Sequence, residues 1–63
     1  MNEVICPVCG KHKFLEPGTY EICPVCGWWE DYYQLTHPDR PGGGNLMSLN
    51  EARKAYKEGR PIR

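Results

Sequence analysis

The alternation of side chains along residues 28–33 is the clearest strand pattern in the chain. In a strand it would place Trp28, Glu30 and Tyr32 on one face and Trp29, Asp31 and Tyr33 on the other. Aromatic residues also favour strands. We therefore predict that residues 28–33 form the last strand of a small sheet.

Two earlier segments are predicted to complete this sheet. Residues 16–19, Glu-Pro-Gly-Thr, favour a type II turn, because proline fixes φ at the second position and glycine supplies a positive φ at the third. Residues 11–15 and 19–22 then become antiparallel strands on either side of the turn. Residues 4–5 can add a short edge strand.

The C-terminal part of the chain has a helical pattern. Leu49, Ala52, Arg53 and Tyr56 recur at the spacing of one helix face. Ser48 followed three residues later by Glu51 forms the capping-box pattern of a helix start. Gly59 and Pro61 are typical of a helix end, so we predict a helix over residues 48–59 and a frayed tail at 60–63.

Residues 34–47 are predicted to be a loop, because they include a segment with two prolines and three glycines. Gly42-Gly43-Gly44-Asn45 precedes the predicted helix, and helix N-termini can bind phosphate. No P-loop lysine follows these glycines. A connector is therefore the preferred interpretation.

The length of the chain limits its core. Sixty-three residues make one domain, residues 1–63, that buries only about 60% of the surface of its unfolded chain. Scaffolds of this size usually need disulfides or a metal for stability. The four cysteines are the evident candidates for either.

The cysteines have the spacing of a structural zinc site. The pentapeptide Cys-Pro-Val-Cys-Gly occurs twice and places two residues within each cysteine pair and thirteen between the pairs, at Cys6, Cys9, Cys23 and Cys26. The prolines favour the tight turn that aims both sulfurs of a pair at one ion. Gly10 and Gly27 can take a positive φ, which turns backbone N–H groups toward the sulfurs.

Other roles for the cysteines remain open. A rubredoxin-like iron site, a redox-active dithiol and two disulfides are the alternatives to one zinc ion per chain. Four thiolates already complete tetrahedral zinc, so His12 and His37 are not expected to be ligands. A closed site also leaves no position for a reactive water, and we expect no enzymatic activity.

Charge and hydropathy bound the possible partners. The formal net charge is zero, and a zinc ion (+2) on four thiolates (−4) would bring the charge to about −2. No apolar run approaches the roughly 20 residues of a membrane span, and the N-terminus has no secretory signal pattern. These features favour the cytoplasm, where cysteines more often bind metal than form disulfides.

The motifs together resemble the small bacterial cysteine-rich CPCC family over about residues 5–56. The resemblance is carried by "CPVCG", "YEICPVCGWWED" and "RPGGGNLMSLNEARKAY". One departure is Val8, where the family name implies a cysteine. The resemblance implies a zinc-ribbon-like fold and points to the four cysteines, the Trp29-Glu30-Asp31 motif, Gly43, Asn45 and the segment from Ser48 to Arg53, but it assigns no activity.

The predicted fold is a metal-stabilised α+β zinc ribbon, a three-stranded antiparallel sheet with one C-terminal helix. The resemblance selects Trp29 as a buried anchor, and the expected core is Phe14, Tyr20, Ile22, Trp29, Leu46, Leu49, Ala52 and Tyr56. A pair between Arg53 and either Glu30 or Asp31 is our hypothesis for why both motifs occur together. Catalysis by Glu30 and Asp31 is not expected, because strand neighbours point to opposite faces.

The preferred functional interpretation is a zinc-stabilised protein-interaction module. Its expected contact surface consists of Trp28, Tyr32, Arg53, Lys54 and Lys57. One alternative is a nucleic-acid-binding zinc ribbon that uses the basic helix, although the chain has no net positive charge. The second alternative is an iron electron carrier.

Overall fold

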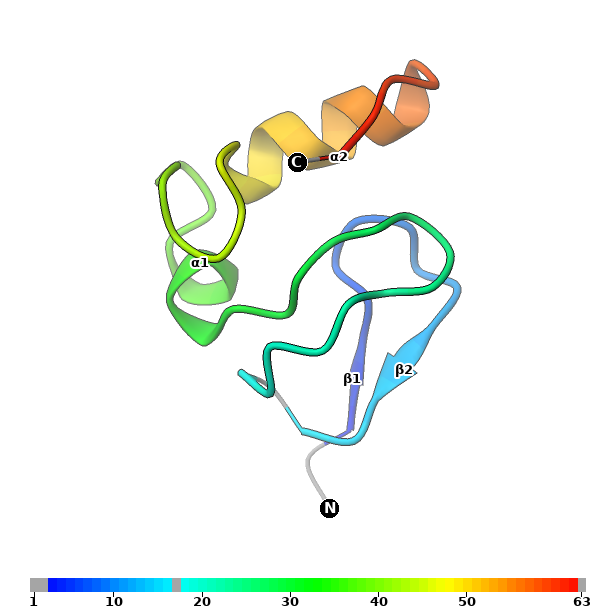
Figure 1. Cartoon of the computed structure of the whole chain (residues 1–63), viewed down its shortest axis with the longest axis vertical. Helices are drawn as coiled ribbons and strands as arrows, with labels where there is room; N and C mark the ends of the chain where they lie inside the picture. The colour runs from blue at the N-terminus through cyan, green and yellow to red at the C-terminus, as the bar shows by residue number, and fades with distance from the viewer. Residues whose placement is uncertain (1–2, 17, 63) are drawn as a thin grey trace.

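The computed structural model describes residues 3–16 and 18–62 and contains two strands and two helices in these ranges. In chain order they are β1 (Val4–Ile5), β2 (Lys13–Phe14), α1 (Tyr32–Thr36) and α2 (Leu49–Lys57). Figure 1 shows β1 and β2 at one end of the molecule, α2 at the other and α1 at one side. The predicted α+β class is therefore confirmed. Pro17 of the predicted type II turn lies outside the described residues, while Gly18 has the expected positive φ of 76°.

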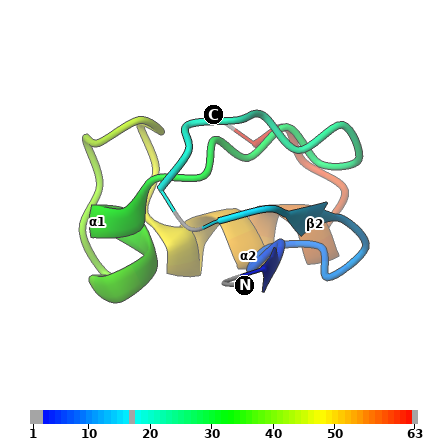
Figure 2. The ribbon, with the colours of Figure 1, turned by 90° about the horizontal axis from the view of Figure 1, so that it is seen from below.

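The chain is arranged in two layers. One layer contains β1, β2 and α2. In the view from below, the segment of residues 20–30 forms the other layer and lies above the first (Figure 2). Residues 58–62, which follow α2, rise toward this segment (Figure 2). The hydrophobic core therefore lies between two thin layers, one of which has little regular secondary structure.

The predicted three-stranded sheet is not formed by the described residues. β1 and β2 pair antiparallel, with Val4 opposite Phe14 and Ile5 opposite Lys13, and they make a two-stranded sheet. The edge strand expected at residues 4–5 is thus present, and the strand expected at 11–15 shrinks to two residues. The zinc-ribbon assignment is not confirmed by this topology.

The strands expected at 19–22 and 28–33 form a separate bridged hairpin, residues 20–30. Ile22 and Trp29 are bridge partners, and Cys23 N–H donates to the carbonyl of Trp28 over 2.8 Å. Tyr20 N–H donates to the carbonyl of Glu30, and Glu30 N–H donates to the carbonyl of Glu21, so two residues face one. Tyr20 lies at φ 60° in this bulge, which disrupts the ladder.

The predicted last strand ends early because Asp31 begins a helix. Its Oδ1 accepts hydrogen bonds from the backbone N–H groups of Tyr33 and Gln34, at 2.8 and 3.3 Å. These bonds satisfy two free donors of the first turn of α1, so Asp31 is an N-cap. The expectation of a loop over residues 34–47 is therefore wrong at its start, because α1 continues to Thr36.

Gln34 and Asn45 tie the loop after α1 into the structure. The buried Gln34 Nε2 lies within 3.1–3.2 Å of the carbonyl oxygens of Arg40, Asn45 and Met47. Its Oε1 accepts from both the backbone N–H and the Nδ2 of Asn45, at 3.0 and 2.9 Å. We call Asp31, Gln34 and Asn45 the polar hub. The glycine-rich segment is folded around this hub and is not a phosphate-type loop.

Two glycines allow the loop to approach the hub closely. A Cβ added at Gly43 would lie 2.7 Å from Asp31 Oδ2 and 2.9 Å from Gln34 Cδ. At Gly44 the nearest atom would be Asp31 Oδ2 at 3.3 Å, and the Gly44 N–H donates to this same oxygen over 2.8 Å. The chain therefore needs glycine at residue 43 for steric reasons, because the hub fills the space that a side chain would occupy.

The start and end of α2 follow the sequence pattern. Ser48 Oγ accepts from the N–H of Glu51 over 3.1 Å, and Glu51 Oε1 accepts from the N–H of Ser48 over 2.9 Å, which forms the predicted capping box. Glu58 is the C-cap, and Gly59 follows at φ 76°. Within the described part of the chain, no helix combines the length and the apolar character that crossing a membrane requires.

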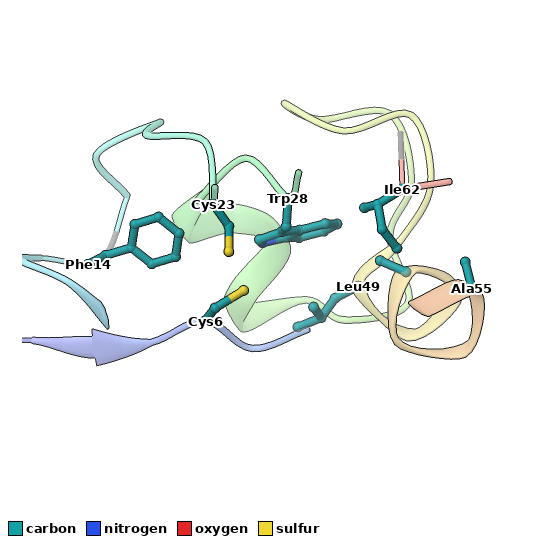
Figure 3. Packing of buried hydrophobic residues seen from close by; sticks show 8 residues of the cluster. Cys6, Phe14, Cys23, Trp28, Leu49, Ala55 and Ile62 are labelled. Atoms are coloured by element: carbon teal, nitrogen blue, oxygen red, sulfur yellow. The ribbon is translucent and has the colours of Figure 1, made fainter. Parts of the chain in front are cut away.

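Trp28 lies at the centre of the core, which reverses the predicted roles of the two tryptophans. Its side chain is fully buried, whereas Trp29 is 43% exposed. Figure 3 shows the Trp28 ring between the cysteine sulfurs on one side and Leu49 and Ile62 on the other. The bulge and the helix that starts at Asp31 limit the hairpin to a few pairs, and its outer face, with Ile22 and Trp29, is turned to solvent.

The rest of the predicted core is partly correct. Phe14, Leu49 and Ala52 are buried, and Tyr56 packs against them while half-buried. The prediction is wrong for Tyr20, Ile22 and Leu46, which are exposed. The core also contains members that were not predicted, namely Cys6, Cys23, Trp28, Ala55 and Ile62.

The C-terminal segment is packed and not frayed as far as residue 62. Ile62 is only 5% exposed and belongs to the hydrophobic core. The N–H of Arg60 donates to the carbonyl of Ala55 over 2.8 Å, which turns the chain back after Gly59. The segment thereby adds an apolar side chain to a core that has few.

Gly43→Ala is expected to lower the free energy of unfolding by about 1–3 kcal/mol, because the new methyl group overlaps Asp31 and Gln34. Gly44→Ala is the matched control from the same loop and should cost less, because its methyl group meets its nearest neighbour at a longer distance. Chemical denaturation of both variants measures the difference. Equal costs, or no cost at residue 43, would contradict the proposed packing around the hub.

Candidate metal centre

The four cysteines of the two knuckles come together at one point. Their Sγ atoms all lie within 4.8 Å of one another, with Cys6 and Cys26 3.6 Å apart and Cys9 and Cys23 3.7 Å apart. A tetrahedral ion with metal–sulfur bonds of about 2.3 Å separates its sulfurs by about 3.8 Å. The arrangement therefore fits one tetrahedral metal ion with four sulfur ligands.

The same distances distinguish the cluster from a pair of disulfides. A disulfide requires sulfurs about 2.05 Å apart, and the four cysteines are free in this structure. The contacts between Cys6 and Cys26 and between Cys9 and Cys23 each join one knuckle to the other. This is the arrangement expected when two turns close around a common ion.

Each knuckle is a tight turn that ends on a glycine. Gly10 N–H donates to the carbonyl of Cys6 over 3.0 Å, and Gly27 N–H donates to that of Cys23 over 2.9 Å. The two glycines have φ values of 70° and 89°, which glycine adopts at little cost. In the first knuckle, the next N–H, that of Lys11, points at Cys9 Sγ over 3.4 Å. The repeated pentapeptide thus produces two similar turns.

The thiols differ in their tendency to ionise. Burial raises the pKa of Cys6 to about 11 and also raises the pKa of Cys26, in each case against the opposing effect of nearby backbone N–H groups. At Cys23 burial acts in the same direction, but the N–H groups of Cys26 and Val25 and neighbouring thiols outweigh it, and the pKa is lowered. A cation between the sulfurs would favour the thiolate form of all four.

The cluster is shielded on its inner side by aromatic rings. Cys6 and Cys23 are buried, and Cys9 and Cys26 are half-buried. In Figure 3 the sulfurs of Cys6 and Cys23 point toward one another between the rings of Phe14 and Trp28. All four ligand positions of a tetrahedral ion would be filled by sulfur, which supports a structural role over a catalytic one.

Neither histidine belongs to the cluster. The ring of His12 meets that of Phe14 edge-on, with ring centroids 4.8 Å apart. His37 stacks on Tyr33 at 4.3 Å, and its Nδ1 lies 3.0 Å from the carbonyl of that residue. Both rings therefore have local packing roles at the ends of β2 and α1.

The residues of the predicted contact surface do not form one surface. Trp28 is wrong as a contact residue because it is fully buried, while Tyr32 is 58% exposed on α1. Arg53 is exposed, but its Nε donates to the carbonyl of Pro7 over 2.8 Å and so joins α2 to the first knuckle. Lys54 and Lys57 are exposed on α2.

The hypothesis of a pair between Arg53 and an acidic residue of the Trp-Glu-Asp motif is also wrong. Asp31 accepts from three backbone N–H groups, and the hydrogen bond of Arg53 goes to the first knuckle. Glu30 is fully buried, and neither of its carboxylate oxygens has a hydrogen-bond partner in the part of the chain that the structure describes. The two acids have different roles, one capping a helix and one unpaired in the core.

Gln34 and Ile62 are the important residues that sequence reasoning missed. The sequence pattern predicts a loop at Gln34 and a frayed tail at Ile62. The sequence signal for Gln34 is Asp31, three residues before it. Aspartate is a preferred N-cap, and a helix that begins after Asp31 has Gln34 in its first turn. An apolar residue shortly after a Gly-Arg-Pro turn was the corresponding signal for Ile62.

Comparison with protein families agrees with the motifs. The family model described as "Cysteine-rich CPCC" matches residues 4–59, which include both knuckles, the polar hub and α2. The chain belongs to this family. A comparison with curated proteins gave no match.

The unpaired Glu30 should make stability depend on pH in an identifiable direction. Burial raises its pKa and the charge of Asp31 adds to this rise. The backbone N–H of Gly18 opposes the rise in part, although it does not meet hydrogen-bond geometry with either carboxylate oxygen. Below the pKa of the unfolded chain the carboxyl is neutral in both states and has no ionisation cost. As the pH rises toward the folded-state pKa, the unfolded state ionises first and the native state loses stability.

Glu30→Gln is therefore expected to raise the denaturation midpoint at pH 7.5 relative to the parent protein, by an amount that decreases toward pH 5. Glu51→Gln is the matched control of opposite sign, because the N–H of Ser48 lowers the pKa of Glu51. The parent and both variants are denatured in parallel at each pH. Loss of metal at low pH affects all three proteins equally, so the differences between them report the ionisation of Glu30 and Glu51. A Glu30→Gln effect that does not change with pH would contradict the assignment.

Proposed function

We propose that this protein binds one zinc ion through Cys6, Cys9, Cys23 and Cys26 and acts as a small protein-interaction module. The observation that carries the metal part is the convergence of the four Sγ atoms at distances that fit tetrahedral coordination. Zinc is preferred because four cysteines in two such pairs are its usual structural ligand set. Iron, which accepts the same geometry, is the metal that the test must distinguish.

A structural role for zinc is supported by the small size of the rest of the core. Besides two of the cysteines, it contains six buried hydrophobic residues, namely Phe14, Trp28, Leu49, Ala52, Ala55 and Ile62. Zinc binding to sites of this kind has an apparent free energy of about 10–16 kcal/mol at neutral pH, more than a chain of this length gains from packing. We propose no enzymatic activity, because four sulfur ligands leave no coordination position for a substrate.

An interaction role is supported by exposed apolar side chains beside the metal centre. Trp29 and Leu46 are 43% and 79% exposed, and they line a groove of about 210 Å³ together with Gly27, Gly44, Asn45 and Ile62. Ile22, the bridge partner of Trp29, is 53% exposed next to it. Exposed apolar groups that cluster in this way are typical of protein contact sites, and tryptophan is among the residues most enriched there.

The nucleic-acid alternative has weaker support. Arg53 is used in a bond to the backbone, and Arg60 pairs with Glu58 at 2.7 Å. Among the residues that the structure describes, Lys54 and Lys57 are the basic side chains of α2 without such a bond. With a net charge of zero, phosphate binding would depend on very few contacts. We propose the cytoplasm as the compartment, because the cluster requires reduced thiols.

Metal analysis of the purified protein is expected to give one zinc ion per chain and a colourless sample. Removing the ion with a chelator should abolish most of the circular dichroism signal of α2, because the remaining core is too small to hold the two layers together. Cys23→Ser should lower zinc affinity strongly, whereas His12→Ala, which leaves the cluster intact, should not. A red, iron-containing protein or an unchanged fold after chelation would contradict the proposal.

Capture of partners from the native cell tests the interaction part. Trp29→Ala and Leu46→Ala, which remove the exposed apolar side chains of the groove, are expected to lose a bound protein that the parent retains, while Lys57→Ala should retain it. Circular dichroism of each variant shows whether the fold is kept. A salt-sensitive gel shift that disappears in a Lys54→Ala, Lys57→Ala double variant would instead support the nucleic-acid alternative.

A further inference from the structure

The peptide bond between Trp28 and Trp29 is held from two sides. Its carbonyl oxygen accepts the N–H of Cys23 over 2.8 Å, and its N–H donates to Oδ1 of Asn45 over 2.9 Å. Because a peptide unit is planar and rigid, the bond from Asn45 to the N–H also sets the direction of the carbonyl group that Cys23 contacts. A loop residue sixteen positions away thus fixes the orientation of a group that contacts the second knuckle.

Asn45 is itself fixed at every polar atom. Its Nδ2 donates to the carbonyl of Trp29 and to Gln34 Oε1, both over 2.9 Å. Its backbone N–H and carbonyl oxygen bond to the side-chain amide of Gln34, at 3.0 and 3.2 Å. The Asn45 side chain bonds the N–H and the carbonyl of Trp29 as a neighbouring strand would, and Asn45 is only 3% exposed.

The first knuckle has no equivalent among the hydrogen bonds of the described residues. There the N–H of Cys6 donates to the carbonyl of His12 over 2.7 Å, which corresponds to the bond between Cys23 and Trp28. The backbone of Phe14, two residues further on, is held by pairing with β1. The second knuckle has a comparable backbone pairing, because Ile22 bridges Trp29 and the N–H of Glu30 donates to the carbonyl of Glu21. What distinguishes it is the additional pair of bonds from Asn45 to the outer edge of Trp29.

We propose that Asn45 is a positioning residue for the metal centre. It holds the Trp28–Trp29 peptide so that the carbonyl group meets the N–H of Cys23, and it thereby keeps the second knuckle in its metal-binding turn. The polar hub thereby adds support at the outer edge of the short hairpin beside this knuckle, where Asn45 bonds both backbone groups of Trp29. This inference rests on the proposed metal binding and adds to it the group that sets the geometry of one half of the site.

Amide hydrogen exchange in the metal-loaded protein separates this role from a general effect on stability. In Asn45→Ala the amide of Cys23 is expected to exchange about tenfold faster or more relative to the parent, while that of Cys6 changes little. Zinc affinity should fall by about 10–100-fold, as it does when other groups that orient metal ligands are removed. Asn45→Ser, whose shorter side chain cannot reach the Trp29 N–H but leaves a polar group in the hub, should show the same selectivity if the alanine variant does not fold.

Ser48→Ala is the matched control, because it removes the capping bond of α2 without touching the Trp28–Trp29 peptide. Its effect should be equal at Cys6 and Cys23, since it acts through global unfolding. Equal acceleration at both cysteines in the Asn45 variants would overturn the inference and leave metal binding intact. A parent protein that contains no metal would overturn both.

Discussion

The convergence of four thiol groups within 4.8 Å of one another is the constraint on which the rest of the structure depends. All four sulfurs can be ionised together at this distance only if a cation lies between them, and a chain of this size has little other means of stabilising two thin layers. The core residues surround this point. Phe14 and Trp28 cover its inner side, and α2 with Ile62 covers the far side of Trp28 (Figure 3).

The polar hub is a second centre of organisation and acts without a metal. Asp31, Gln34 and Asn45 have a hydrogen-bond partner for every side-chain oxygen and nitrogen, although all three are buried. Fully satisfied networks of this kind specify one arrangement, because any alternative leaves a buried polar atom without a partner. The hub explains why a loop with three consecutive glycines has a defined path. Asp31, Gln34, Gly43 and Asn45 therefore depend on one another: the first two fill the space beside Gly43, and Gln34 bonds Asn45.

The parts of the fold that sequence predicted correctly are those controlled by local rules. The capping box at Ser48, the positive φ of Gly10 and Gly27, and the metal-ligand spacing each depend on a few neighbouring residues. The errors arose where one local rule competed with another. Strand alternation was extended through Asp31, whose capping bonds start α1 instead. Trp28 is buried and Trp29 is not, because the hairpin face that carries Trp28 packs against the rest of the chain. Alternation shows that the two rings lie on opposite faces but does not show which face is buried.

The two adjacent tryptophans give the molecule two built-in spectroscopic probes in different environments. Trp28 is dry, lies beside the sulfurs and has an Nε1 atom without a hydrogen-bond partner in the described structure, whereas Trp29 is partly in water. Fluorescence from Trp28 is therefore expected to be blue-shifted and to respond to an ion bound by the cysteine cluster. Fluorescence from Trp29 reports on the groove beside it. Replacing either ring by phenylalanine makes it possible to follow the inside and the outside of this small domain separately.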